Sequence, residues 1–164
     1  MIGTSMFDIA SAGELGLRCH GVDHDGLKEL VGPPSSWGPQ KTPENAKIWR
    51  YGNVEFHFSN WKVYLIFSDH DDLTDGGEFL RIDPWIVRRG LDRQVFQAAL
   101  FEAGIAFETI APDYDPSQRL VRTQSGAVFT FNECSQDGES GLVAWSMETQ
   151  SVNGERNYVY PIGT

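Results

Sequence analysis

The sequence predicts an α+β fold in which helices cover one face of an antiparallel sheet, and three observations support this. Residues 54–58 alternate between apolar and polar side chains, as in a half-buried strand. Residues 62–68 (K-V-Y-L-I-F-S) are apolar on both faces, which is typical of a strand in the middle of a sheet. Residues 91–104 repeat apolar side chains at helical spacing.

The two strands over 54–58 and 62–68 form the centre of the predicted sheet. Ser59-Asn60-Trp61 separates them, and Asn is a turn former that tolerates a positive φ. We therefore expect a hairpin at the heart of the sheet, with His57 on its solvent-facing or open side. The core is expected to hold six large side chains in mutual contact: Phe56, Phe58, Leu65, Leu100, Phe129 and Phe131.

Two helices are predicted from caps and apolar stripes. The first follows Asp23 or Asp25 as its N-cap and stops at Gly32-Pro33, with Leu27, Leu30 and Val31 facing inward. The second follows Asp92 and stops at Gly104. Its predicted inward stripe consists of Val95, Phe96, Ala99, Leu100 and Ala103.

The other segments are assigned by alternation and by Pro or Gly breaks. Further strands are expected over 105–110, 120–123, 127–132 and 142–147, whereas 33–46 reads as an irregular loop. Pro84 makes 79–87 an edge segment or a loop. Residues 1–8 and 150–164 are expected to be tails, although 158–160 could add an edge strand. The chain, residues 1–164, fits a single domain.

An internal repeat is suggested by a constant separation of 73 residues. It relates Leu27 to Leu100, Phe56 to Phe129 and Phe58 to Phe131. Units of about 22–78 and 91–148 would each run helix, loop, strand, turn, strand. A chance match of aromatic spacings is the alternative.

Charge and cysteine content limit the classes of function. A net charge of −10 repels phosphate backbones and anionic membranes, so no nucleic-acid or membrane partner is expected. It favours a basic protein partner, although acidity also serves solubility alone. Cys19 and Cys134 stand far apart in no metal-type spacing, which predicts buried thiols in a reducing compartment. With no signal-like start and no long apolar run, the expected location is the cytoplasm.

The first unit also resembles a known module. Its matching residues are Leu30, Gly32, Pro34, Trp49 and Tyr51, followed by V-E-F-H-F and K-V-Y-L-I-F. This pattern is similar to the helix–hairpin module of the β-lactamase inhibitory protein and of the small lipoprotein of outer-membrane assembly. A tandem pair would imply the inhibitory-protein arrangement, but the paired disulfides and the lipobox cysteine of those families are missing here.

The string Y-G-x-x-E-F-x-F resembles small cytoplasmic proteins of bacterial polymorphic-toxin loci, many of them acidic immunity proteins. That resemblance implies the neutralisation of a toxin by binding.

Candidate chemistry is sparse. His20 and His24 stand four apart as in a zinc pair, but glycines interrupt the helix and no third ligand is evident. The acids of 69–78 fail the spacing of a calcium loop. Adjacent Cys19 and His20 point to opposite faces of a strand. We therefore expect a non-catalytic protein with no cofactor and no metal site.

The expected function is non-catalytic protein binding, and the specific hypothesis is a cytoplasmic immunity-type inhibitor of a toxin. The predicted partner-binding residues are Asp69, Asp71, Asp72 and Asp75, the densest acidic cluster, and Trp61, since Trp is enriched at hot spots. The alternative is a small-ligand-binding protein or small enzyme that uses the open face of the sheet. The sequence does not indicate an oligomeric state.

Overall fold

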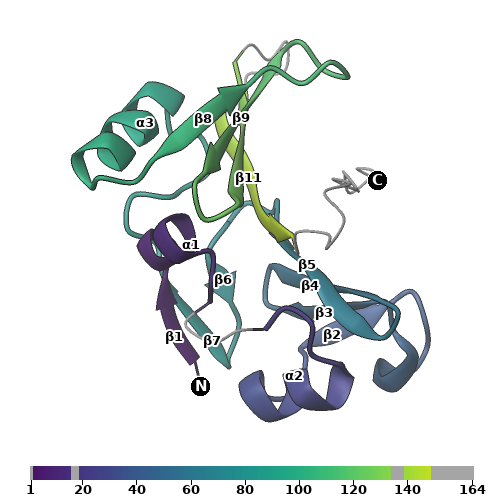
Figure 1. Ribbon diagram of the computed structural model, residues 1–164. Coiled ribbons are helices and arrows are strands. Elements are labelled where there is room, and N and C mark those ends of the chain that lie inside the picture. The colour runs from purple at the N-terminus through teal and green to yellow at the C-terminus, as the bar shows by residue number, and fades with distance from the viewer. Residues whose placement is uncertain (1, 16–18, 134–138, 149–164) are drawn as a thin grey trace.

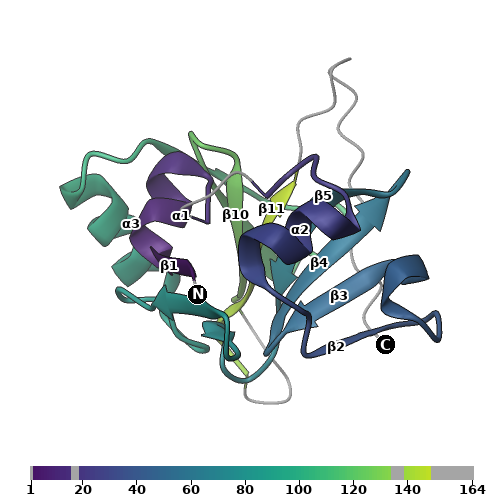
Figure 2. The same cartoon turned by 90° about the horizontal axis from the view of Figure 1, so that it is seen from below.

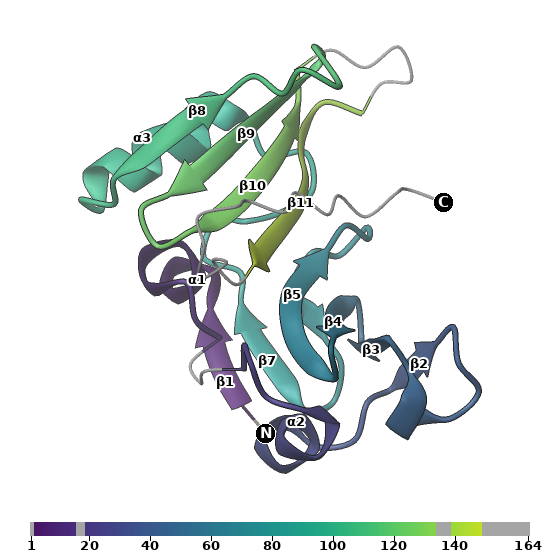
Figure 3. The ribbon, with the colours of Figure 1, turned by 45° about the vertical axis from the view of Figure 1, so that its right-hand side comes forward.

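The computed structural model describes residues 2–15, 19–133 and 139–148. Its main element is an eight-stranded antiparallel sheet with the strand order β2-β3-β4-β5-β11-β10-β9-β8 (Figures 1 and 3). The strands are β2 (Ser36–Gly38), β3 (Ile48–Tyr51), β4 (Val54–Ser59), β5 (Lys62–Ser68), β8 (Phe107–Ile110), β9 (Gln118–Thr123), β10 (Ala127–Asn132) and β11 (Gly141–Glu148). We call β2–β5 the N-terminal half of the sheet and β8–β11 the C-terminal half.

Among the described residues, three helices and a small second sheet pack on one face of the large sheet (Figure 2). The helices are α1 (Met6–Ala12), α2 (His24–Val31) and α3 (Arg93–Glu102), with a 3-10 turn, η1, at Pro43–Asn45. The small sheet has the order β1-β7-β6, from β1 (Ile2–Ser5), β6 (Asp75–Gly76) and β7 (Leu80–Asp83). Its core-facing residues join those of the large sheet in one cluster, which contains the fully buried Phe56, Phe96, Phe129, Phe131 and Trp145.

The predicted α+β class and mainly antiparallel sheet are confirmed. The 54–58 and 62–68 segments form the β4–β5 hairpin, and β5 lies in the middle of the sheet between β4 and β11. Val63 to Ser68 are all buried or half-buried, as expected for a strand covered on both sides.

Both central strands contain a register shift. In the β4–β5 pair, Phe58 pairs with Val63, whereas the adjacent His57 pairs with Leu65. Tyr64 of β5 therefore has no residue opposite it on β4. In β11, Phe131 of β10 faces Leu142 but Thr130 faces Ala144, so Val143 is an extra residue. Each shift is a β-bulge, which bends and twists its strand.

The bulge in β5 corrects one part of the predicted core. Five of the six predicted residues are buried in the main cluster, but Leu65 is not in it. Leu65 packs with Phe67 and Ala144 on the opposite face of the sheet. Simple alternation puts residues 63, 65 and 67 on one face, and the bulge moves 65 and 67 to the other.

The prediction that residues 1–8 form a tail is wrong for residues 2–8. Ile2–Ser5 pair in parallel with Leu80–Asp83, and Ser5 caps α1 by accepting a hydrogen bond from the Asp8 amide at 3.0 Å. Met6 is fully buried. A four-residue strand with a distant partner has too few residues to produce a recognisable alternation. The segment 150–164 and Cys134 lie outside the described residues.

Three further expectations are corrected. The 33–46 loop contains β2 and η1, because β2 pairs with β3 through Trp37 and Trp49. The 79–87 segment contains β7, which is the central strand of the small sheet and ends before Pro84. Helix α3 has the predicted cap, but Val95 and Ala103 are exposed. It buries only Phe96 and Leu100, because it contacts the sheet through a narrow stripe.

The acidic loop after β5 is ordered by its own short-range hydrogen bonds. Leu73 is buried and its carbonyl accepts the Trp145 indole N–H at 2.8 Å. Asp72 accepts hydrogen bonds from Thr74, and Asp75 accepts one from the Gly77 amide. Gly76 packs so tightly on β7 that a Cβ there would lie 1.9 Å from a backbone carbonyl oxygen. This loop is therefore partly a core element.

Candidate functional site

The face of the large sheet opposite the helices, here called the open face, carries most of the polar chemistry. One row of directly paired residues crosses it from β3 to β8. In order, the row contains Arg50, Glu55, Phe67, Ser146, Val128, Arg122 and Glu108. Opposite charges are paired at both ends, and the middle of the row is apolar or small.

The first end of this row is a network of three side chains on β3 and β4. The Arg50 Nε donates to Glu55 Oε1 at 2.9 Å, and His57 Nε2 lies 2.8 Å from Glu55 Oε2. Burial raises the pKa of Glu55, but the hydrogen bonds from His57 and Arg50 outweigh it, so the pKa is lowered overall. His57 lies on the open face with its side chain 13% exposed, so the expectation that it faces this side is confirmed.

Next to this network lie Tyr64 and Glu148, both half-buried. Burial raises the pKa of Glu148, and burial together with the negative charge of Glu148 raises the pKa of Tyr64. Tyr64 also packs against the small apolar cluster of Leu65, Phe67 and Ala144. This part of the open face therefore holds several titratable groups in partly desolvated surroundings.

Beside the small apolar cluster, the open face has a depression of about 490 Å³, here called the open-face depression. Its lining combines apolar, amide, hydroxyl and charged groups: Phe67, Asp69, Arg89, Tyr114, Gln118, Thr130, Asn132, Val143 and Ala144. The Tyr114 side chain is 53% exposed. The extra residue of the β11 bulge, Val143, contributes to the lining, so the bulge helps to shape the hollow.

Arg89 holds the walls of this depression together. Its guanidinium donates to the carbonyl oxygens of Asp69 at 2.7 Å and Val143 at 3.3 Å, and it pairs with Glu139 at 3.0 Å. A single side chain thus connects the acidic loop to the bulged strand. These bonds fix the Arg89 guanidinium against the acidic loop and the bulged strand, which gives it a positioning role in the wall.

The structure separates the predicted partner-binding residues. Asp69 lines the open-face depression, and Asp71 is exposed two residues further along the same loop. Asp72 and Asp75 stabilise turns of that loop. Trp61 lies in the turn before β5, whereas the four aspartates follow the last residue of β5. The length of that strand, about 20 Å, therefore separates Trp61 from the aspartates.

The histidine pair considered as a zinc site is not assembled. His24 stacks on Phe58 with ring centroids 3.7 Å apart, and its Nε2 lies 2.7 Å from the Ala46 carbonyl oxygen. His20 Nε2 instead lies 3.1 Å from the Met147 carbonyl oxygen. Burial raises the pKa of the Cys19 thiol to about 11, so it is a protonated core residue. Within residues 2–15, 19–133 and 139–148, no group of three His, Cys, Asp or Glu side chains could hold a metal ion.

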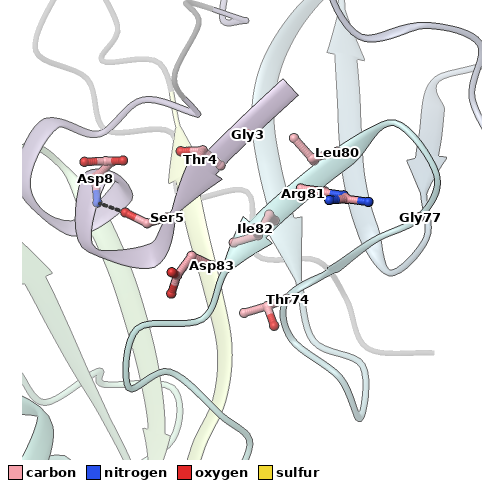
Figure 4. A pocket seen from close by; sticks show the side chains of 10 residues that line it. All are labelled: Gly3, Thr4, Ser5, Asp8, Thr74, Gly77, Leu80, Arg81, Ile82 and Asp83. Atoms are coloured by element: carbon pink, nitrogen blue, oxygen red, sulfur yellow. Dashed lines mark hydrogen bonds between the residues drawn. The ribbon is translucent and has the colours of Figure 1, made fainter. Parts of the chain in front are cut away.

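A second, larger hollow of about 660 Å³ lies on the small sheet (Figure 4). Figure 4 shows Arg81 on one side of it, and Asp8 and Asp83 on the other. Asp83 accepts a hydrogen bond from the Trp85 amide, and Ser5 caps α1, so both serve local structure. The polar groups that line this hollow do not converge on a common point, and we do not assign a ligand to it.

Sequence reasoning missed most of the residues that line the open-face depression. Arg89, Tyr114 and Gln118 come from loops and a strand end that lie far apart in the sequence. No spacing rule connects them, because the pairing of β5 with β11 brings them together. Asp69 was found because acids cluster visibly around it.

Comparison with known proteins gives no family for this chain. No family model matches it, and no curated protein sequence matches it. A crystal structure of an extracellular protein containing a SCP domain from Bacillus anthracis is similar over 84% of this chain, with 14% identity and a TM-score of 0.41. The chain spans 47% of that protein's structure. No described helix is long and apolar enough to cross a membrane.

Proposed function

We propose that this protein is a non-catalytic binding module that inhibits a basic protein through the open-face depression, in the manner of a cytoplasmic immunity protein. One observation carries the proposal: an acidic loop residue, Asp69, lines a hollow that is also lined by Phe67 and the exposed Tyr114. Aromatic side chains surrounded by polar groups are typical of protein-binding hot spots.

Charge supports a cationic partner. The chain has a net charge of −10, and Asp69 and Asp71 are exposed next to the depression. Opposite charge speeds the encounter between two proteins, and salt screens that attraction over about 8 Å at physiological ionic strength. The free, buried Cys19 agrees with a reducing compartment such as the cytoplasm.

The test uses the product of the gene that lies next to this one, purified as a catalytically inactive variant. We expect the double variant Asp69→Asn, Asp71→Asn to slow association by about 3- to 10-fold at low salt, with less change in dissociation. The matched control is Glu29→Gln, Glu44→Gln, because these acids are exposed, lie outside the lining of the depression and give the same change in net charge. Equal association rates for both variants would remove the acidic loop from the interface.

A second candidate is a small-ligand-binding protein or enzyme, favoured by the Arg50–Glu55–His57 network. A carboxylate that orients an imidazole is the arrangement used by general bases. If this reading holds, Glu55→Gln would abolish ligand binding or turnover, whereas Asp69→Asn, Asp71→Asn would not.

We also propose that the two halves of the sheet arose by duplication. Three observations support this. First, the 73-residue separation relates β4 to β10. Second, each half is a meander whose first strand lies at an edge of the sheet. Third, the bulge in β5 lies opposite His57 and Phe58, and the bulge in β11 lies opposite the residues 73 positions later, Thr130 and Phe131.

A further inference from the structure

The turn before β5 holds a tryptophan in a backbone conformation that favours glycine. Ser59 pairs with Lys62, so Asn60 and Trp61 form a two-residue hairpin loop, with φ of 49° and 65°. Such a loop is commonly Asn-Gly, because both positions need positive φ. A bulky residue there is strained, because its Cβ lies too close to the following carbonyl oxygen. The Trp61 side chain is nevertheless 62% exposed.

Trp85 shows what normally offsets this cost. It has a similar φ of 53°, but its ring packs edge-on against Phe7 and Phe96, at centroid distances of 5.4 and 6.2 Å. Trp61 has one described ring neighbour, His24, tilted at 6.0 Å. The fold therefore gains little from the Trp61 side chain that would offset its backbone cost.

Trp61 has basic neighbours, although the chain is acidic and acids also lie near this turn. Lys62 follows it and is exposed. Lys47, also exposed, immediately precedes β3, and its carbonyl accepts the Phe58 amide near the same turn. Asp23 also lies near the turn, because the Val63 amide donates to the carbonyl of its neighbour Val22 at 2.9 Å.

We propose that Trp61 and Lys62 of one copy of this protein insert into the open-face depression of a second copy. The depression, about 490 Å³, offers Phe67, Val143 and Ala144 to an indole and the Asp69 carboxylate to an ammonium group. The proposal rests on the depression being a binding site, as proposed above, and it names the chain's own basic, aromatic turn as an occupant.

The geometry dictates the form of the assembly. The turn and the depression lie at opposite ends of β5, so the contact is heterologous and each copy keeps one free turn and one free depression. The copies add head to tail. Their like net charge opposes this, so association is weak and is best measured in about 0.15 M salt, where repulsion beyond about 8 Å is screened.

The test is sedimentation of the full chain over about 10 μM to 1 mM. The wild-type weight-average mass should rise with concentration, whereas Trp61→Gly should remain monomeric. Thr130→Arg, which fills the depression from β10, should also remain monomeric. Mixing the two variants restores a single intact contact, so the mixture should form dimers and nothing larger.

Urea unfolding of Trp61→Gly separates binding from folding. The variant should be as stable as wild type or more stable, because glycine relieves the backbone cost. A clear loss of stability would assign Trp61 to the fold and overturn the proposal. A wild-type protein that stays monomeric at 1 mM, or a mixture that stays monomeric, would also overturn it. Binding of the neighbouring gene product through Asp69 and Asp71 is measured separately, so either proposal can fail alone.

Discussion

The two faces of the eight-stranded sheet contain the same kinds of strand but are built differently. The helix-covered face carries fully buried aromatic rings such as Phe56, Phe129 and Trp145. The open face carries ion pairs at both ends of a row and only a small apolar cluster in its middle. Most of the buried apolar side chains therefore lie on one face, and the polar network lies on the other.

The largest expected loss of stability comes from a cavity on the helix-covered face. Phe56→Ala should cost about 3–5 kcal/mol of unfolding free energy, because a fully buried aromatic ring leaves a cavity. Chemical denaturation measures it. Phe101→Ala on α3 is the control, since that side chain is 82% exposed and should change stability by less than about 0.5 kcal/mol. An unchanged midpoint for Phe56→Ala would contradict the strand register.

A smaller effect is expected from Phe67→Ala on the open face. Phe67 belongs to a cluster of three buried residues, so the loss should be about 2 kcal/mol. The same denaturation experiment compares it with Phe56→Ala. Equal losses of unfolding free energy for the two variants would show that the two faces are packed alike.

The ion pairs of the open face should make part of the stability depend on pH, and Glu55→Gln tests this. The lowered pKa means that Glu55 ionisation favours the folded state. This contribution is present above the unfolded pKa and is lost as the pH falls through the lower folded pKa. The variant should therefore be less stable than wild type by about 1 kcal/mol at pH 7, and the difference should shrink as the solution is acidified. A difference that is independent of pH would contradict an ionised Glu55.

The smallest expected effect is a gain of stability, in Glu148→Gln. Burial raises the pKa of Glu148, so its ionisation disfavours the folded state, and stability is lost as the pH rises through that pKa. Glu148→Gln should raise stability at pH 7 by about 0.5 kcal/mol or less, because solvent screens a half-buried group. Thermal unfolding at pH 4 and pH 7 checks it; a destabilised variant at pH 7 would show that the Glu148 charge is stabilised.

Local patterns predicted the fold where a strand or helix carries its own signal. The β4–β5 hairpin and the Asp23 and Asp92 caps follow from side chains within a few residues. The prediction failed at Ile2–Ser5 and Leu65, because pairing with a distant strand and a β-bulge leave no local signal. The open-face depression was out of reach for the same reason, since loops far apart in sequence line it.

The strand order also has a consequence for how the chain folds. Pairings inside each half join near neighbours in sequence, whereas the seam between the halves pairs Ile66 with Met147, about 80 positions later. Closing so long a loop costs entropy before any contact compensates for it, and such contacts slow folding. Each meander can therefore form early and the seam last. A chain cut between the halves, near Gly90, leaves two fragments whose reassembly would need only this seam and the shared core.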